Sequence, residues 1–307
     1  MRSPNFNGWE DTLTGSFHQS RLAFGFSSDD YHAGLVGNYH SPFSLLSYEG
    51  VVRMNTKFVE EAESFLEQHP DIREFDLLLP DMNAVFRGKR IQREKLISIY
   101  KKGFYFPASV FAMDVTGETM EETGLGFKSG DQDIPCYPIP ETLKVVPWRK
   151  ERGQLLLRML EPDGSPFFGN PREVLKSICK NLSESGWRAI VAVEIEFYLV
   201  DPKRRPGQPP RPVFSRLTGQ REAEGQLYSL SSLDTHELFL KDISEAAIIQ
   251  NIPADTALAE LAPGQFEVNL HHVPDAVLAC DHAVPVSYTH LRAHETLRYL
   301  VCRLLLE

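Results

Sequence analysis

The chain has 307 residues, of which 42% are hydrophobic and 24% charged, and its formal net charge at pH 7 is -10. This length and composition are typical of a soluble protein with one large or two modest domains. The acidic balance disfavours nucleic acid as a partner and favours a cationic ligand such as an amine. The four cysteines lack CxxC spacing, so neither a zinc site nor a disulfide framework is indicated. We find no 18-residue apolar run and no signal peptide, and we expect a cytoplasmic protein without a membrane partner.

The first part of the chain, residues 1–53, has no sustained helical or strand period. We expect it to stand outside the fold, and two interpretations are open. It is either a mobile extension or upstream sequence translated in frame ahead of Met54. From Thr56 the apolar residues recur at helical spacing until Pro70, which predicts a packing helix.

Residues 75–79 predict a strand that leads into the turn beginning at Pro80. Asp81 lies in this turn, where aspartate commonly bonds to its own backbone. A short helix over residues 94–102, ended by a glycine, and a strand-like run over residues 104–114 follow. These small alternating elements predict an α+β module.

The next segment contains a predicted central strand over residues 154–160. Asn170 then caps a helix with Pro171 at its first position, and Gly186 ends it. We expect its core face to be formed by Val174, Leu175, Ile178 and Leu182. Residues 201–226 contain five prolines and predict an irregular loop.

Residues 191–200 read as a buried strand, yet Glu194 and Glu196 lie in its middle. Side chains two apart on a strand project to the same face, so these carboxylates converge. Unpaired buried charges are costly unless a cation or a donor compensates them. The pair therefore indicates a cation site, an edge strand with one solvated face, or buried ion pairs with Arg and Lys.

Asp234 and Glu237 have the spacing of a capping box, and predict a helix start. The expected inner face consists of Phe239, Ile243, Ala246 and Ile249. A turn at Pro263-Gly264 then separates Glu260 from a strand-like run that carries Glu267. Four carboxylates from two such segments suit Mg²⁺ or Mn²⁺ rather than zinc. We do not assign His271 or His272 as ligands.

Together, Glu194-Ile-Glu196, Glu260 and the sequence PGQFE at residues 263–267 resemble the glutamine synthetase superfamily. Residues 81–90 and 103–114 are similar to the branch that joins glutamate to polyamines, the γ-glutamylputrescine synthetases. The resemblance covers about residues 54–284. It implies a β-grasp N-terminal domain over residues 54–147 and a partial α/β catalytic domain over residues 148–284.

The resemblance also implies a chemistry. ATP would phosphorylate the γ-carboxylate of glutamate, and a small amine such as putrescine would displace the phosphate; ammonia is the alternative amine. Glu194 would hold the nucleotide-side metal ion, and Glu196, Glu260 and Glu267 the glutamate-side ion. Asp81 would bind the amine in the active site of a neighbouring subunit within a homo-oligomeric ring.

The end of the sequence differs from the family pattern. A helix is predicted from Pro274 to about Val284, and residues 285–307 resemble translated adapter sequence. We therefore expect a non-native tail and an incomplete copy of the ligase. A non-catalytic, metal-binding fragment is the alternative of another class.

Overall fold

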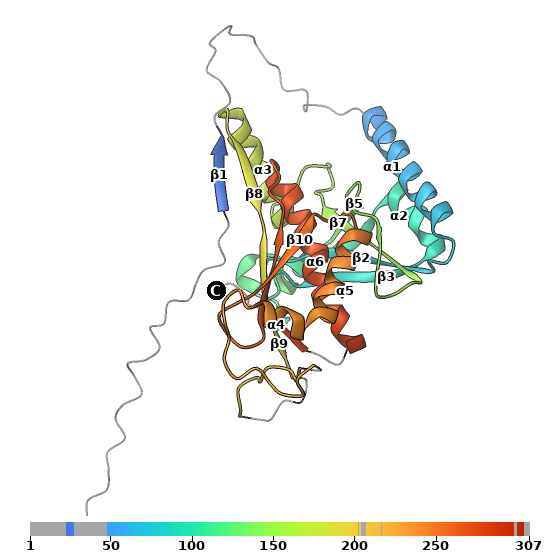
Figure 1. Cartoon of the computed structure of the whole chain (residues 1–307). Helices are drawn as coiled ribbons and strands as arrows, with labels where there is room; N and C mark the ends of the chain where they lie inside the picture. Colours follow the sequence, from blue (N-terminus) through green and yellow to red (C-terminus); the bar gives the residue numbers. More distant parts are fainter. Residues whose placement is uncertain are drawn as a thin grey trace, which may run out of the picture.

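The computed structural model of the chain describes residues 23–27, 48–201, 203, 207–215, 217–297 and 300–303. Within these residues, two larger sheets carry most of the buried side chains. Figure 1 shows how the strands and helices are arranged. Helices α1 and α2 lie over the first sheet, and α4 and α5 lie with the second. No helix among the described residues is long and apolar enough to cross a membrane.

The first sheet has six strands, in the order β3-β2-β7-β5-β4 with β6 beside β7. The strands β2 and β7 pair in parallel, and the other pairs are antiparallel. The bounds are β2 (Glu74–Pro80), β3 (Phe86–Gln92), β4 (Phe104–Pro107), β5 (Asp133–Pro138), β6 (Lys144–Val145) and β7 (Arg152–Met159).

Alternation along β2 gives this sheet its two buried faces. Phe75, Leu77 and Leu79 pack in one cluster with residues of α1 (Tyr48–Gln68) and α2 (Leu96–Lys102). The glycine that ends α2 has φ 73°, as the sequence predicted. Short 3₁₀ helices lie at Arg93–Lys95, Ala108–Phe111, Glu121–Thr123 and Phe127–Ser129.

Strand β7 follows the domain boundary expected near residue 147, yet it belongs to the first sheet. This strand pairs with β2, β5 and β6 and buries Leu155 and Leu157 in the first core. The apolar run was predicted to be a central strand, and it is one, but in the first sheet. The spacing of apolar residues does not indicate which sheet a strand joins. The strand-like run after residue 104 is also shorter than predicted, since β4 ends at Pro107 and a 3₁₀ turn follows.

The second sheet has the order β10-β11-β9-β12, and all its neighbours are antiparallel. Its strands are β10 (Ala254–Ala259), β11 (Gln265–Leu270), β9 (Glu194–Val200) and β12 (Leu300–Arg303). Phe197 and Phe266 pack with Phe239 and Ile243 of α5 (Glu237–Ile249) against one face. The opposite face carries the alternate residues of β9 and β11.

The predicted strand over residues 191–200 is interrupted at Val193. Its first part belongs to β8 (Arg188–Ala192), and its second part is β9. The strand β8 pairs with β1 (Ala23–Ser27), and α1 begins at Tyr48. Residues 23–27 and 48–53 therefore lie in a strand and a helix, although we expected residues 1–53 to stand outside the fold. The other residues of that segment lie outside the described part.

Helix α3 (Pro171–Glu184) begins as predicted, because the side chain of Asn170 accepts a hydrogen bond from the Arg172 N–H at 3.2 Å. Its expected core face is wrong in part: Val174 is 44% and Ile178 is 58% exposed. Leu175, from the same predicted face, does pack in the cluster between α3, β8 and α6. Helix α3 contacts β8 and α6 through this face.

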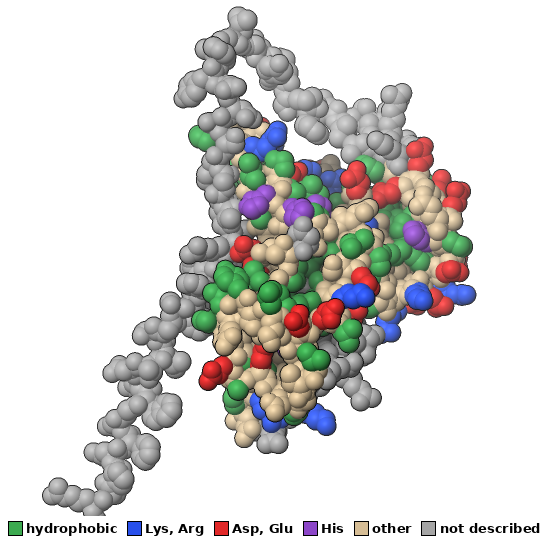
Figure 2. Space-filling model, in the orientation of Figure 1, with side chains coloured by type: hydrophobic (Ala, Val, Ile, Leu, Met, Phe, Trp, Pro, Cys, Tyr) green, Lys and Arg blue, Asp and Glu red, His purple; other side chains and the backbone are tan. Residues whose placement is uncertain are grey.

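The predicted capping box at Asp234 is wrong. A short helix, α4 (Leu230–Thr235), begins first, and the Ser229 hydroxyl caps it by accepting from Ser232 N–H at 3.2 Å. Helix α5 follows directly and has no side-chain cap. Phe239, Ile243 and Ala246 are buried as expected, whereas Ile249 is exposed. Figure 2 shows apolar side chains gathered on the surface around α4.

Helix α6 (Ala276–Leu297) continues through Pro285, past the end predicted near Val284. Within it, Val284 packs against Leu78, Ile139 and Leu156 of the first part of the chain. The Gln250 amide also donates to the carbonyl of Val145 at 3.1 Å. These contacts join the two sheets, and β12 places residues 300–303 of the expected tail beside β9.

Candidate metal centre

The antiparallel pairing of β9 with β11 positions two carboxylates directly opposite each other. Glu196 pairs in register with Glu267, and Glu194 with Asn269. Because Phe197 and Phe266 point into the core, the residues next to them in sequence point to the other face. The apolar alternation of the strands therefore forces Glu196 and Glu267 together.

The turn between β10 and β11 adds a third carboxylate. Glu260 follows the last residue of β10, and its backbone N–H donates to the Gln265 carbonyl at 2.9 Å. Gly264 completes the turn with φ 74°, a conformation that side chains with a Cβ rarely adopt. As a result, one carboxylate oxygen each from Glu196, Glu260 and Glu267 lies within 4.8 Å of the others.

The electrostatics of this group favour a cation. Burial, and after it the carboxylates of Glu194, Glu260 and Glu196, together raise the pKa of Glu267 to about 7, while a hydrogen bond with Asn269 opposes the shift. Burial also raises the pKa of Tyr198, with smaller contributions from Glu196 and Glu260. Negative charge thus accumulates on one face of the sheet, and three clustered carboxylates are the oxygen ligands that Mg²⁺ and Mn²⁺ prefer.

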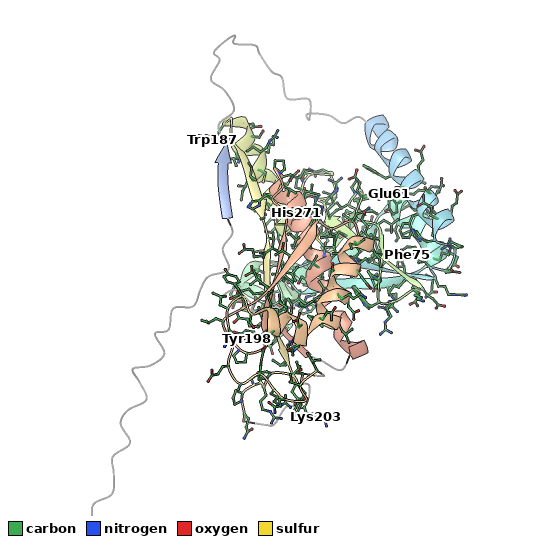
Figure 3. All side chains as sticks on the ribbon, viewed as in Figure 1. Glu61, Phe75, Trp187, Tyr198, Lys203 and His271 are labelled. Atoms are coloured by element: carbon green, nitrogen blue, oxygen red, sulfur yellow. The ribbon has the colours of Figure 1, made fainter. Side chains whose placement is uncertain are left out.

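Two side chains that the sequence analysis did not assign also belong to this site. The Gln265 amide donates to the Glu196 carboxylate at 2.8 Å, and its oxygen accepts from the Ala262 N–H at 3.1 Å. Tyr198, labelled in Figure 3, follows Glu196 by two residues on β9. The alternation that grouped Glu194 with Glu196 could have identified Tyr198, because all three positions share one face.

The structure brings together three of the four predicted carboxylates. Glu194 is outside the group of three, although its charge acts on Glu267. His271 and His272 are exposed and do not belong to it. The resemblance implied the same division, with Glu196, Glu260 and Glu267 on one ion and Glu194 on another. That these residues bind metal ions stays a prediction.

Asp81 lies between β2 and β3, in the first sheet. Its side chain is buried, and one oxygen accepts from the N–H groups of Asn83 and Val85 at 2.8 and 2.9 Å. The other oxygen accepts from Arg87 Nε at 2.8 Å. The local turn bonding that the sequence allowed is therefore present, and binding of an amine stays a prediction.

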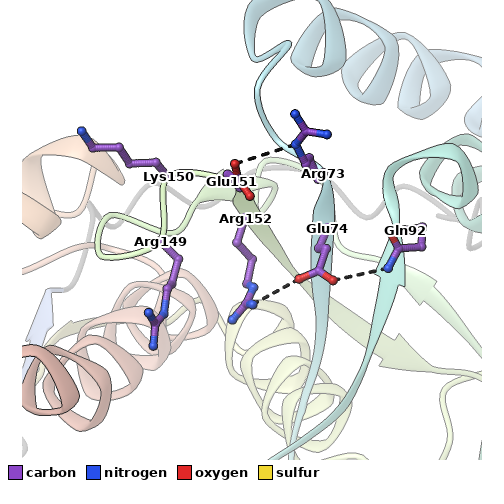
Figure 4. Close-up of a pocket in the computed structure, with 7 residues that line it drawn as sticks. All are labelled: Arg73, Glu74, Gln92, Arg149, Lys150, Glu151 and Arg152. Atoms are coloured by element: carbon purple, nitrogen blue, oxygen red, sulfur yellow. Dashed lines mark hydrogen bonds and ion pairs between the residues drawn. The ribbon is translucent and has the colours of Figure 1, made fainter.

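A cavity of about 380 Å³ lies elsewhere, at the end of the first sheet (Figure 4). Its charged side chains pair with one another: Arg152 with Glu74 at 3.1 Å, and Arg73 with Glu151 at 3.8 Å. Lys150 extends away from the guanidinium of Arg149. The cations do not converge on one point, so this hollow is not a candidate site.

Comparison with known proteins identifies the fold that carries the carboxylates. Residues 168–294 match the family model of the glutamine synthetase catalytic domain. This part of the chain is similar to a glutamine synthetase catalytic domain. The match includes all four predicted metal-site carboxylates, and it runs beyond the boundary that was expected at residue 284.

Curated relatives confirm the resemblance seen in the sequence. The chain is 42% identical over 233 residues to the gamma-glutamylputrescine synthetase of Escherichia coli (strain K12), covering 76% of this chain and 49% of that protein. It is 25% identical over 232 residues to the glutamate–isopropylamine ligase of a Pseudomonas species, covering 75% and 50%. The chain thus spans about half the length of these relatives.

Solved structures agree on the glutamine synthetase fold, with its mixed sheet and helices. A complex of GmaS with ADP matches with a TM-score of 0.63 at 21% identity, over 78% of this chain and 50% of that one. A glutamine synthetase of Plasmodium falciparum matches with a TM-score of 0.61 at 13% identity, over 81% and 50%. At these identities the likeness concerns the fold alone.

Proposed function

We propose that this chain supplies the carboxylate metal site of an ATP-dependent ligase that joins the γ-carboxylate of glutamate to a small amine. The observation that carries the proposal is the convergence of Glu196, Glu260 and Glu267 on one face of the second sheet. The raised pKa of Glu267 supports it, because a cation would relieve the accumulated negative charge. The family match over the same residues supports it independently.

The residues present fit a divalent metal ion. Glu196, Glu260 and Glu267 would hold an ion on the glutamate side, and Glu194 an ion on the nucleotide side. When bound, such ions supply neutralisation of phosphate charge during transfer to the glutamate carboxylate. The protein's own part is to hold the carboxylates in register on β9 and β11, with Gln265 fixing the orientation of Glu196.

We assign the amine to the putrescine or polyamine class. Identity to the gamma-glutamylputrescine synthetase of E. coli is 42%, whereas identity to the glutamine synthetase of Mycolicibacterium smegmatis is 26%. Asp81 would receive the amine as a cation, in exchange for its present contact with Arg87. Phosphate would leave from a γ-glutamyl phosphate as the amine forms the amide bond.

The proposal includes an arrangement of domains. The first sheet with α1 and α2 would be a β-grasp domain, supported by its central parallel pair β2 and β7. In a homo-oligomeric ring, the loop that carries Asp81 would reach the carboxylates of a neighbouring subunit. Because β7 is the last strand of the first sheet along the chain and ends at Met159, we place the boundary between this domain and the catalytic part after Met159.

Metal binding is the direct test. We expect Glu196→Gln to weaken Mn²⁺ binding at least about tenfold, since even changes outside the ligand set can cost this much. Isothermal titration calorimetry of the chain measures it. The matched control is Glu184→Gln on the exposed end of α3, which also removes one charge and should leave the affinity unchanged. Equal binding by wild type and Glu196→Gln would refute the assignment.

Amine specificity is tested in a chimera that joins this chain, up to Val284, to the second half of the E. coli relative. We expect faster ATP consumption with glutamate and putrescine than with glutamate and ammonia. The same chimera with Glu196→Gln is the control for dependence on the carboxylate site. A preference for ammonia would assign the chain to ammonia-using glutamine synthetases instead.

A further inference from the structure

The turn between β10 and β11 determines where Glu260 lies relative to Glu267, and a segment outside both strands holds that turn. The Gly264 carbonyl accepts from Leu199 N–H of β9 at 2.8 Å, so the peptide group on the C-terminal side of Gly264 is fixed to the sheet. On the other side, the Gly264 N–H donates to the Glu222 carboxylate at 2.8 Å. Glu222 therefore completes the attachment of the turn.

The segment that carries Glu222 is itself anchored to the end of β9. Arg221 forms an ion pair with Asp201, which directly follows Val200, and donates to the carbonyl of Pro212. The guanidinium of Arg221 also stacks over the ring of Phe214, 3.9 Å from its centroid. A residue next to such an anchor has a defined position, which a carboxylate on a mobile loop would not have.

Close backbone packing holds the same segment against the other side of the turn. A Cβ at Gly225 would lie 2.0 Å from the carbonyl oxygen of Leu261, so only glycine allows this approach. The Tyr228 N–H also donates to the Ala259 carbonyl at 2.9 Å, at the end of β10. The turn is thus enclosed by residues 222–228 on one side and by β9 on the other.

We propose that Glu222 is a positioning residue for the metal centre: by holding the Gly264 peptide, it fixes the separation of Glu260 from Glu267 and so sets the affinity of the site for a divalent ion. This inference rests on the proposed function, because it concerns the same carboxylates. Glu222 lies outside the group of Glu196, Glu260 and Glu267, and acts on the site through a backbone hydrogen bond.

The test measures Mn²⁺ affinity by calorimetry on the 307-residue chain. We expect Glu222→Ala to weaken binding about tenfold, in the range seen for changes behind metal ligands. Glu222→Gln should bind within about threefold of wild type, because its amide oxygen can still accept the Gly264 N–H. The matched control is Glu224→Ala, which removes a nearby exposed charge and should leave the affinity unchanged.

Thermal unfolding in EDTA shows whether a Glu222 variant is less stable as a whole, which would distinguish a general loss of stability from a misplaced metal site. If Glu222→Ala does not fold, Glu222→Asp takes its place: it keeps the charge but lacks the reach, and we expect it to bind more weakly than Glu222→Gln. The inference is overturned if Glu222→Ala binds Mn²⁺ like wild type, or if Glu224→Ala weakens binding as much as Glu222→Ala does. It is also overturned if Glu222→Gln binds Mn²⁺ no better than Glu222→Asp. Absence of Mn²⁺ binding in the wild type would refute both the proposed function and this inference.

Discussion

Two strands of this protein carry the same pattern, a pair of acids two residues apart, with opposite consequences. On β2 the pair is Glu74 and Asp76; on β9 it is Glu194 and Glu196. In both cases the side chains share one face of a sheet. The difference lies in the neighbouring strands, because β2 meets basic residues and β9 meets further carboxylates.

The acids of β2 are neutralised within the first sheet. Arg90 on β3 donates to Asp76 at 2.6 Å, and Arg152 on β7 donates to Glu74 at 3.1 Å. Figure 4 shows the second of these pairs at the end of the sheet. A buried acid with such partners stabilises the fold only as long as the pairs are complete.

The acids of β9 meet Glu267, which lies opposite Glu196, and Glu260 at the adjacent turn. Charge accumulates there and raises the pKa of Glu267, after the contribution of burial. The strand register, and not the spacing along the chain, therefore decides whether such a pair of acids meets basic side chains or further carboxylates.

The largest expected effect comes from breaking the pairs on β2. Asp76→Ala removes the buried carboxylate that pairs with Arg90 and Arg152, and we expect it to lower the free energy of unfolding by about 2 to 3 kcal/mol. Urea denaturation measures the change. Arg73→Ala is the control, since its pair with Glu151 is 75% and 72% exposed and such pairs contribute less than about 1 kcal/mol. If Asp76→Ala and Arg73→Ala lowered the free energy of unfolding equally, the pairs on β2 would contribute no more than an exposed ion pair.

The opposite sign is expected at Glu267. Its folded-state pKa of about 7 exceeds the ordinary value of 4.5, so folding loses stability as pH rises from 4.5 to 7, while below this window both states are protonated. Glu267→Gln should therefore raise the free energy of unfolding at pH 8 by about 1 to 2 kcal/mol and leave it unchanged at pH 4. Urea denaturation in EDTA at the two pH values checks this. A gain of equal size at both would contradict it.

The smallest effect is expected at Asp81. In Asp81→Asn, one oxygen can still accept from the N–H groups of Asn83 and Val85, but the charge that pairs with Arg87 is lost. We expect the free energy of unfolding to fall by about 1 kcal/mol. Asp71→Asn, on an exposed turn, is the control and should change nothing. A loss above about 3 kcal/mol would contradict this, because the charge pair with Arg87, rather than the retained hydrogen bonds, would then account for most of the contribution of Asp81.

Much of the candidate site could be predicted because it follows from short-range rules. Alternation on β9 places Glu196 on the face opposite the core, and the Pro263-Gly264 turn returns the chain so that Glu267 can approach Glu260. The contact of Gln265 with Glu196 could not be predicted in the same way. Its hydrogen bond to Glu196 depends on the register of two strands that are far apart in sequence.

In the fold as well, features that depend on nearby residues were predicted, and features that depend on packing were not. The Asn170 cap and the glycine at the end of α2 depend on hydrogen bonds within a few residues, and they were predicted correctly. The exposure of Val174 and Ile178 depends on what packs against α3, and helical spacing alone marked both as core. The start of α5 was misplaced because the Ser229 cap begins a separate short helix before it.

By itself, the sequence determined which residues share a strand face, where several helices begin and end, and that acids gather near a tight turn, since these features depend on backbone geometry over a few residues. Only the tertiary structure decided that β7 completes the first sheet and that Glu196 faces Glu267. It also decided that Arg90 and Arg152 neutralise one acid pair while the other meets more acids. Pairing between distant strands is set by the packing of whole sheets, and the charge of a site is the sum over all the strands that meet there.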